Sequence, residues 1–218
     1  MKKFIFFLLL AVVLFKFVDF NLKINTEDSE VQIDKDDYVV EIPFYYDHSK
    51  APQQLNKKEV LDSIHKASII WENACGISFK YEGDIDSHND IRLIPGNLVV
   101  RGSRNGVIKW QTELLDDGAI GEAPVGDEDG PVFGFVMNLN STADFNLIPV
   151  ISHEFGHVIG LEHNEDNRSI MAPVTDDKQL LRPNDANMCL YLKSRWYGMN
   201  EKEAMNKFGL VYASKYGY

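Results

Sequence analysis

The sequence predicts an α+β domain with a mixed, twisted sheet, and three observations lead to this class. Alternating apolar and polar residues predict strands at 38–46 and 77–82. Apolar residues at helical spacing predict a helix over 56–75, between these strands. Further helical patterns follow an irregular stretch at 162–182 and indicate a smaller, mostly irregular and helical C-terminal subdomain. Strands and a helix that come first, with helices after them, are typical of α+β domains.

The helix over 56–75 has a recognisable start and end. Asn56 with Glu59 resembles a capping box, in which the two residues satisfy each other's backbone N–H groups. Gly76 supplies the stop, because glycine readily adopts the left-handed conformation that ends helices. The strand at 77–82 alternates strictly, which predicts one face in water.

The later elements are predicted from weaker patterns. Residues 101–131 are rich in Gly and Asp, which predicts loops around one short strand near 119–125. A helix begins near Pro149, a residue that a first helical turn tolerates, and runs to Gly160. The remaining elements are strands at 91–94 and 132–139 and helices near 184–197 and 201–216.

The N-terminus resembles a secretory signal. Two lysines precede an unbroken apolar run from Phe4 to Phe15, which is too short to span a bilayer alone. No small-residue cleavage site follows, so a cleaved signal peptide and a signal anchor extending to Phe20 both remain open for residues 1–20. Either one places the rest of the chain outside the cytoplasm, and the anchor would be its one membrane contact. There Cys75 and Cys189 could be oxidised, although the sequence does not show whether they pair.

Composition limits the domain organisation of the chain and the classes of binding partner that it can have. The acidic stretch 21–37 predicts a linker or short pro-segment, followed by one folded domain at 38–198 and a helical extension at 199–218. A net charge of −11 argues against a nucleic-acid-binding protein, which would carry a basic surface. Two cysteines exclude a four-cysteine zinc or iron–sulfur site within one chain.

One segment carries most of the chemistry. His153 and His157 are four residues apart and so share a helix face, where two imidazoles can point at one metal ion. Glu154 lies about 100° around the helix, where it can flank a reacting water rather than bind the metal. Gly160 lets the chain turn out of the helix and bring back His163 as a third ligand. Three protein ligands with an open fourth position are typical of catalytic rather than structural zinc.

This pattern, H-E-x-x-H-x-x-G-x-x-H, resembles that of the metzincin metalloproteases. Ser169-Ile170-Met171-Ala172-Pro173 resembles their Met-turn, and its short distance from His163 and its Met-x-Pro sequence resemble the matrixin branch. The resemblance implies a metzincin-like fold for 38–198 and a zinc-dependent endopeptidase of protein or peptide substrates. It implies zinc ligation by His153, His157 and His163, and Glu154 as the general base. It also implies that Met171 packs beneath the metal, and that Pro173, Val174 and Thr175 line the S1′ pocket.

The chain also departs from the matrixin pattern. Asn164 follows the third histidine where matrixins usually have Ser, and Thr175 stands where a Tyr often lines the specificity pocket. Glu122 occupies the place of a ligand to the second, structural zinc, so a single zinc is expected. No switch cysteine precedes the domain, so latency through a thiolate is not supported.

A group of acidic residues lies in the Gly-rich loops. Carboxylates suit calcium, which matrixins bind in comparable loops, and a solvated acidic loop explains the same residues equally well. The residues are Asp116, Asp117, Asp127, Glu128 and Asp129.

The leading hypothesis is therefore hydrolysis of a peptide that lies extended along the edge strand near 118–125. The alternative is a secreted or membrane-anchored zinc-binding interaction module without turnover. Retention of Glu154 argues against this alternative, because binding alone does not need a general base.

Overall fold

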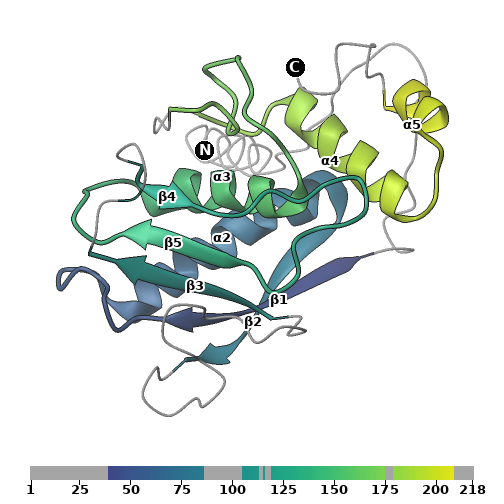
Figure 1. Ribbon diagram of the computed structural model, residues 1–218. Helices are drawn as coiled ribbons and strands as arrows, with labels where there is room; N and C mark the ends of the chain where they lie inside the picture. The colour runs from purple at the N-terminus through teal and green to yellow at the C-terminus, as the bar shows by residue number, and fades with distance from the viewer. Residues whose placement is uncertain (1–38, 86–104, 113–114, 116–118, 175–178, 209–218) are drawn as a thin grey trace, which may run out of the picture. The chain divides into compact units, whose positions relative to one another are not determined.

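The computed structural model describes residues 39–85, 105–112, 115, 119–174 and 179–208 (Figure 1). All of them belong to one compact unit of the chain. The predicted signal segment, the acidic linker, the strand at 91–94 and the end of the helix predicted at 201–216 lie outside the described residues. Among the described helices, none combines the length and apolar composition that crossing a bilayer requires.

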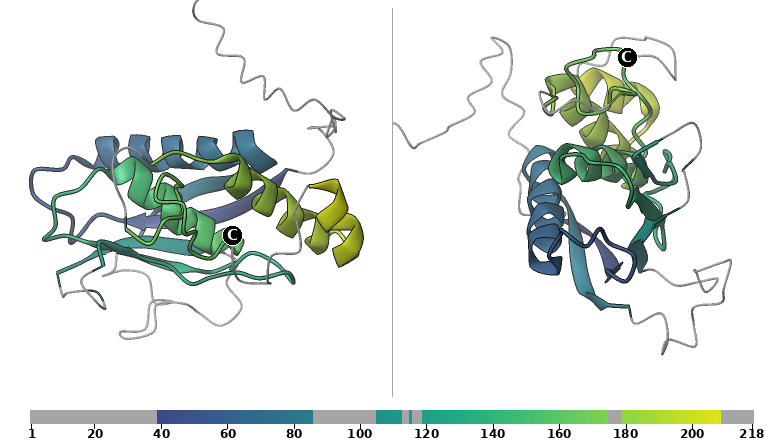
Figure 2. Two further views of the ribbon diagram at one scale, coloured as in Figure 1. Left: turned by 90° about the horizontal axis from the view of Figure 1, so that it is seen from above. Right: turned by 90° about the vertical axis from the view of Figure 1, so that its left-hand side faces the viewer.

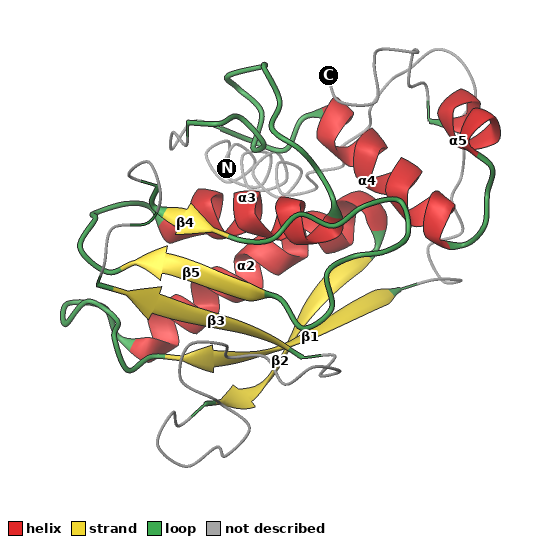
Figure 3. Ribbon diagram, viewed as in Figure 1, coloured by secondary structure: helices red, strands yellow, loops and turns green. Residues whose placement is uncertain are grey.

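Five strands form one mixed sheet in the order β2-β1-β3-β5-β4 (Figures 1 and 3). The first four are parallel, and β4 pairs antiparallel with β5 at one edge. The strands are β1 (Val40–Asp47), β2 (Ile77–Asp84), β3 (Gly106–Gln111), β4 (Gly121–Glu122) and β5 (Val136–Asn140). The α+β class with a mixed sheet is confirmed.

Strand β3 corrects the prediction that 101–131 consists of loops around one short strand. It lies at the centre of the sheet between β1 and β5, and Val107, Ile108 and Trp110 are all buried. The alternation of Ile108 and Trp110 with Lys109 and Gln111 is short, and its glycine-rich surroundings favoured a loop. The strand predicted at 132–139 begins later, at Val136, and the one near 119–125 is limited to Gly121–Glu122.

Helices α2 (Lys57–Cys75) and α3 (Leu147–Ile159) lie against the same face of the sheet (Figure 2). Asn56 caps α2 by accepting hydrogen bonds from the amides of Lys58 and Glu59, and Gly76 ends it at φ 68°. Between helices and sheet lies one apolar core, in which Phe155 of α3 stacks on Phe79 of β2 with ring centroids 3.5 Å apart.

The C-terminal part contains α4 (Pro183–Trp196) and α5 (Glu201–Lys207). A disulfide joins Cys75, at the end of α2, to Cys189 in α4, which settles the question that the sequence left open. Lys193 of α4 also donates hydrogen bonds to the carbonyls of Cys75 and Gly76. Helix α4 is therefore fastened to α2 by a covalent and a polar link at the same point.

Candidate metal centre

The helix that carries the histidine motif is fixed at both ends. Asn146 precedes α3, and its side-chain oxygen accepts a hydrogen bond from the amide of Ile148, so the helix begins two residues before the predicted Pro149. Gly160 ends it at φ 118°, a conformation that L-residues with a side chain rarely adopt. A Cβ at Gly160 would also lie 3.0 Å from the carbonyl carbon of Gly126, so the β4–β5 loop can pass close to the end of α3.

Three imidazoles meet beside α3, two from the helix and one from the segment that follows it. One ligand-capable atom from each of His153, His157 and His163 lies within 4.8 Å of the others, and no other group of three such residues occurs among the described residues. The Nε2 atom of His157 is 3.0 Å from Nε2 of His153 and 3.3 Å from Nε2 of His163. His153 and His157 are buried, whereas His163 is exposed, so the cluster opens to solvent on one side.

Backbone carbonyls orient the two buried rings. Nδ1 of His153 donates to the carbonyl of Ile170 and Nδ1 of His157 donates to that of Leu161, both at 2.8 Å. Since a carbonyl can only accept, each Nδ1 carries the proton and each Nε2 presents a lone pair. Burial lowers the pKa of His153 to about 3 and that of His157 to about 4, so both rings are neutral at physiological pH.

This arrangement fits a zinc ion. Two Nε2 lone pairs that face each other at 3.0 Å repel unless a cation lies between them. Ligands of tetrahedral zinc with bonds of about 2.0–2.1 Å are themselves about 3.3–3.4 Å apart, close to the two observed separations. The Nδ1–carbonyl bonds are the outer contacts that metal-binding histidines usually make.

Glu154 lies beside the histidines with one free oxygen. Its side chain is 5% exposed and accepts a hydrogen bond from the amide of Ala123, while Oε2 has no partner among the described residues. Burial, followed by the negative charge of Glu122, raises the pKa of Glu154 to about 8. A cation at the imidazoles would instead lower the pKa of Glu154, because its positive charge favours the ionised carboxylate.

A buried carboxylate that the sequence analysis did not single out connects the segment after α3 to α4. Asp185 is fully buried and accepts hydrogen bonds from the side chains of Ser169 and Asn164. Ser169 in turn accepts from the amide of Met171, and the amide of Asn164 donates to the carbonyl of Met171. Asp185 thereby holds the turn around Met171 and the residue after His163. The one feature of the sequence that could have pointed to Asp185 is its position as an acid in the first turn of a helix that begins with Pro183.

The other residues predicted for the site are distributed unevenly. Met171 is fully buried, and its sulfur packs so closely on Gly156 that a Cβ there would overlap it. Pro173 and Val174 are exposed, and Thr175 lies outside the described residues. Strand β4 runs beside α3, and the described residues pair it on one side only, with β5.

Two of the acidic loop residues, Asp127 and Glu128, use their carboxylates in other contacts. Glu128 accepts from the hydroxyl of Tyr191 and pairs with Arg195, and a side-chain oxygen of Asp127 accepts from the amide of Asp129. Asp116 and Asp117 lie outside the described residues.

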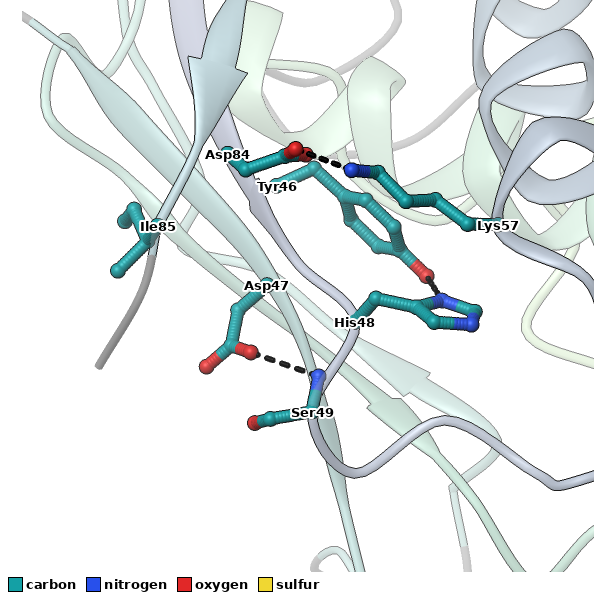
Figure 4. Close-up of a pocket in the computed structure, with 7 residues that line it drawn as sticks. All are labelled: Tyr46, Asp47, His48, Ser49, Lys57, Asp84 and Ile85. Carbon is teal, nitrogen blue, oxygen red and sulfur yellow. Dashed lines mark hydrogen bonds and ion pairs between the residues drawn. The ribbon is translucent and has the colours of Figure 1, made fainter. Parts of the chain in front are cut away.

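A second polar site lies at the carboxyl ends of β1 and β2, and none of its lining residues belongs to the histidine cluster (Figure 4). It is a pocket of about 210 Å³. The hydroxyl of Tyr46 accepts from the indole of Trp110 and lies 2.7 Å from Nδ1 of His48, while Lys57 pairs with Asp84. Its polar groups thus pair with one another, and His48 contributes to this network rather than to the metal centre.

Comparison with known proteins supports the resemblance drawn from the motif. The matrixin family model matches residues 109–192. The chain is 28% identical over 136 residues to hatching enzyme of Paracentrotus lividus, which is 60% of the chain and 21% of that protein. It is 29% identical over 133 residues to matrix metalloproteinase-26 of Homo sapiens, covering 56% of the chain and 45% of that protein. The chain thus spans less than half the length of each of these relatives, and its resemblance to matrixins is confirmed.

Proposed function

We propose that this matrixin-like chain is a zinc-dependent endopeptidase that hydrolyses peptide bonds of protein substrates. One observation carries the proposal: two neutral imidazoles present their Nε2 lone pairs to each other at 3.0 Å, beside a buried carboxylate with a free oxygen. Apolar packing does not account for this arrangement, because both features are costly without a ligand. The matches to a hatching enzyme and a matrix metalloproteinase point to the same class of activity.

His153, His157 and His163 would hold a single zinc ion, which supplies Lewis acidity when it is bound. Glu154 would accept the proton of the attacking water at Oε2 and donate it to the leaving amine. The amide of Ala123 holds the other carboxyl oxygen and so orients Oε2.

An extended substrate would pair with the outer edge of β4. The substrate would then form an additional strand of the sheet beside α3. The residues around Pro173 and Val174 would form the wall of the S1′ pocket. We infer an extracytoplasmic location from the apolar run after the N-terminal lysines and from the Cys75–Cys189 disulfide, since disulfides persist in oxidising compartments.

Parallel assays of the full-length protein test the assignment. Glu154→Gln keeps the shape of the side chain and removes its basicity, so zinc content should stay at one per chain while peptide cleavage falls by about 10²–10⁴-fold. His157→Ala should lose zinc as well as activity. Glu162→Gln changes an exposed glutamate next to His163 and serves as the matched control, with parental zinc content and rate.

Two results would contradict the proposal. Full cleavage by zinc-loaded Glu154→Gln would remove Glu154 as the base. A parent protein that binds one zinc and cleaves no peptide in a broad library would favour the interaction module without turnover.

A further inference from the structure

Helix α2 makes a directed contact with the helix that carries the histidines. Trp71 is fully buried, and its indole N–H donates a hydrogen bond of 2.8 Å to the carbonyl of Ser152. Ser152 immediately precedes His153 and lies 81 residues from Trp71 along the chain. A carbonyl oxygen has two lone pairs, so this bond can coexist with the helical bond from the amide of Gly156.

The same indole also contacts α3 one turn later. Gly156 lies between the two motif histidines, and a Cβ there would be 3.0 Å from Cζ2 of Trp71 and would overlap the sulfur of Met171. Trp71 and Met171 therefore both pack against α3 at Gly156, in the turn that joins His153 to His157. Glycine is the residue that this close approach allows.

The geometry of the imidazoles depends on how α3 is rotated about its axis. Side chains extend to about 5–6 Å from a helix axis, so a rotation of about 10° moves a ring nitrogen by about 1 Å. Functional groups need to be held within about 0.5 Å of their productive positions. The apolar contacts of α3 are non-directional, whereas the Trp71–Ser152 bond fixes both distance and direction.

We propose that Trp71 is a positioning residue for the metal centre, setting the rotation of α3 through Ser152 and Gly156. This inference rests on the proposed zinc site. It predicts that removing the indole N–H weakens zinc binding beyond any effect on folding. Removing a group that supports a metal ligand typically lowers metal affinity by about 10–100-fold. Trp71 contacts the residue next to a ligand and not the ligand itself, so we expect a loss of zinc affinity at the lower end of this range, about tenfold.

A second tryptophan provides a matched control. Trp110 in β3 is also buried, and its indole donates a hydrogen bond of 2.8 Å to the hydroxyl of Tyr46 at the other polar site. Trp71→Phe and Trp110→Phe thus remove the same donor from the same core. The full-length parent and both variants would be compared by the zinc dissociation constant, measured in competition with a chelator, and by the urea midpoint of unfolding.

We expect similar losses of the urea midpoint in both variants and a roughly tenfold higher zinc dissociation constant for Trp71→Phe alone. Equal zinc affinity in all three proteins, or an equal loss in both variants, would overturn the positioning role. If Trp71→Phe does not fold, 3-benzothienylalanine at position 71 keeps the ring shape without the N–H and gives the same test. A parent that binds no zinc overturns the proposed function itself, and this outcome is recognisable without either variant.

Discussion

Helices α3 and α4 both contribute to one apolar core but differ in how far they are buried in it. Eleven of the thirteen residues of α3 are buried, against four of the fourteen in α4. Helix α3, with α2 and the sheet, forms a packed half stabilised by apolar burial. The described residues of 160–174 and 179–208 form a linked half, which adds apolar side chains to the same core and is also fastened by a disulfide and by hydrogen bonds from identifiable side chains. The comparison indicates that the packed half unfolds cooperatively as one unit, whereas single attachments of the linked half can be lost without unfolding the rest.

The largest effect is expected from the packed half. Phe155→Ala removes a fully buried ring that stacks on Phe79, and such truncations cost about 3–5 kcal/mol. Since small domains are stable by only about 5–15 kcal/mol, unfolding and zinc release should occur together at a much lower urea concentration. Val174 is 77% exposed, so Val174→Ala should leave the urea midpoints of unfolding and of zinc release unchanged. Loss of zinc from folded Phe155→Ala protein would show that this half does not fail as a unit.

The disulfide tests the linked half. Replacing Cys75 and Cys189 by alanine opens a connection across 114 residues, and losing such a bond costs about 2–5 kcal/mol, chiefly by freeing the unfolded chain. The urea midpoint should fall while the folded variant keeps its zinc, because two of the three histidines lie on the packed α3. The parent treated with reductant and an alkylating agent should match the variant. Zinc loss from the folded variant would make α4 a direct determinant of the metal centre.

The same division explains what the sequence could predict of the fold. Helix α2 and strand β2 were predicted closely because each has one wet face and a clear terminal residue at Asn56 or Gly76. Strand β3 was missed because its alternation is short, with Ile108 and Trp110 alternating with Lys109 and Gln111, and because the sequence around it is rich in Gly. Helix α3 was placed from its motif and its glycine, although the Asn146 cap was overlooked.

The candidate site shows the same limit. The histidine spacing is local, so the sequence alone could predict which three rings meet. The supports of these rings are long-range: Trp71 reaches Ser152 across 81 residues, and Asp185 reaches Asn164 across 21. One-dimensional spacing does not encode such partners, and a buried aspartate looks like any other acid at a helix start.

The smallest effect is expected at the ion pair between Glu128 and Arg195, which joins the β4–β5 loop to α4. Their side chains are 29% and 25% exposed and their charged atoms are 3.3 Å apart. Partly exposed pairs of this kind contribute about 0.2–1 kcal/mol, and salt screens them. Glu128 also accepts from Tyr191, and Arg195 donates to the carbonyl of Met199, so single variants would mix several losses.

A double-mutant cycle with Glu128→Gln and Arg195→Met isolates the pair. We expect a coupling energy of about 0.5 kcal/mol from urea unfolding, reduced further in 1 M NaCl, where the Debye length is about 3 Å. A parallel cycle at Asp166 and Arg168, an ion pair with a more exposed arginine, should give a smaller coupling. A coupling above about 2 kcal/mol at Glu128 would contradict the comparison, because one polar contact would then rival the disulfide. A small value means that the Glu128–Arg195 pair is one of several weak attachments of α4 beside the disulfide, so the loss of this pair alone should leave α4 in place.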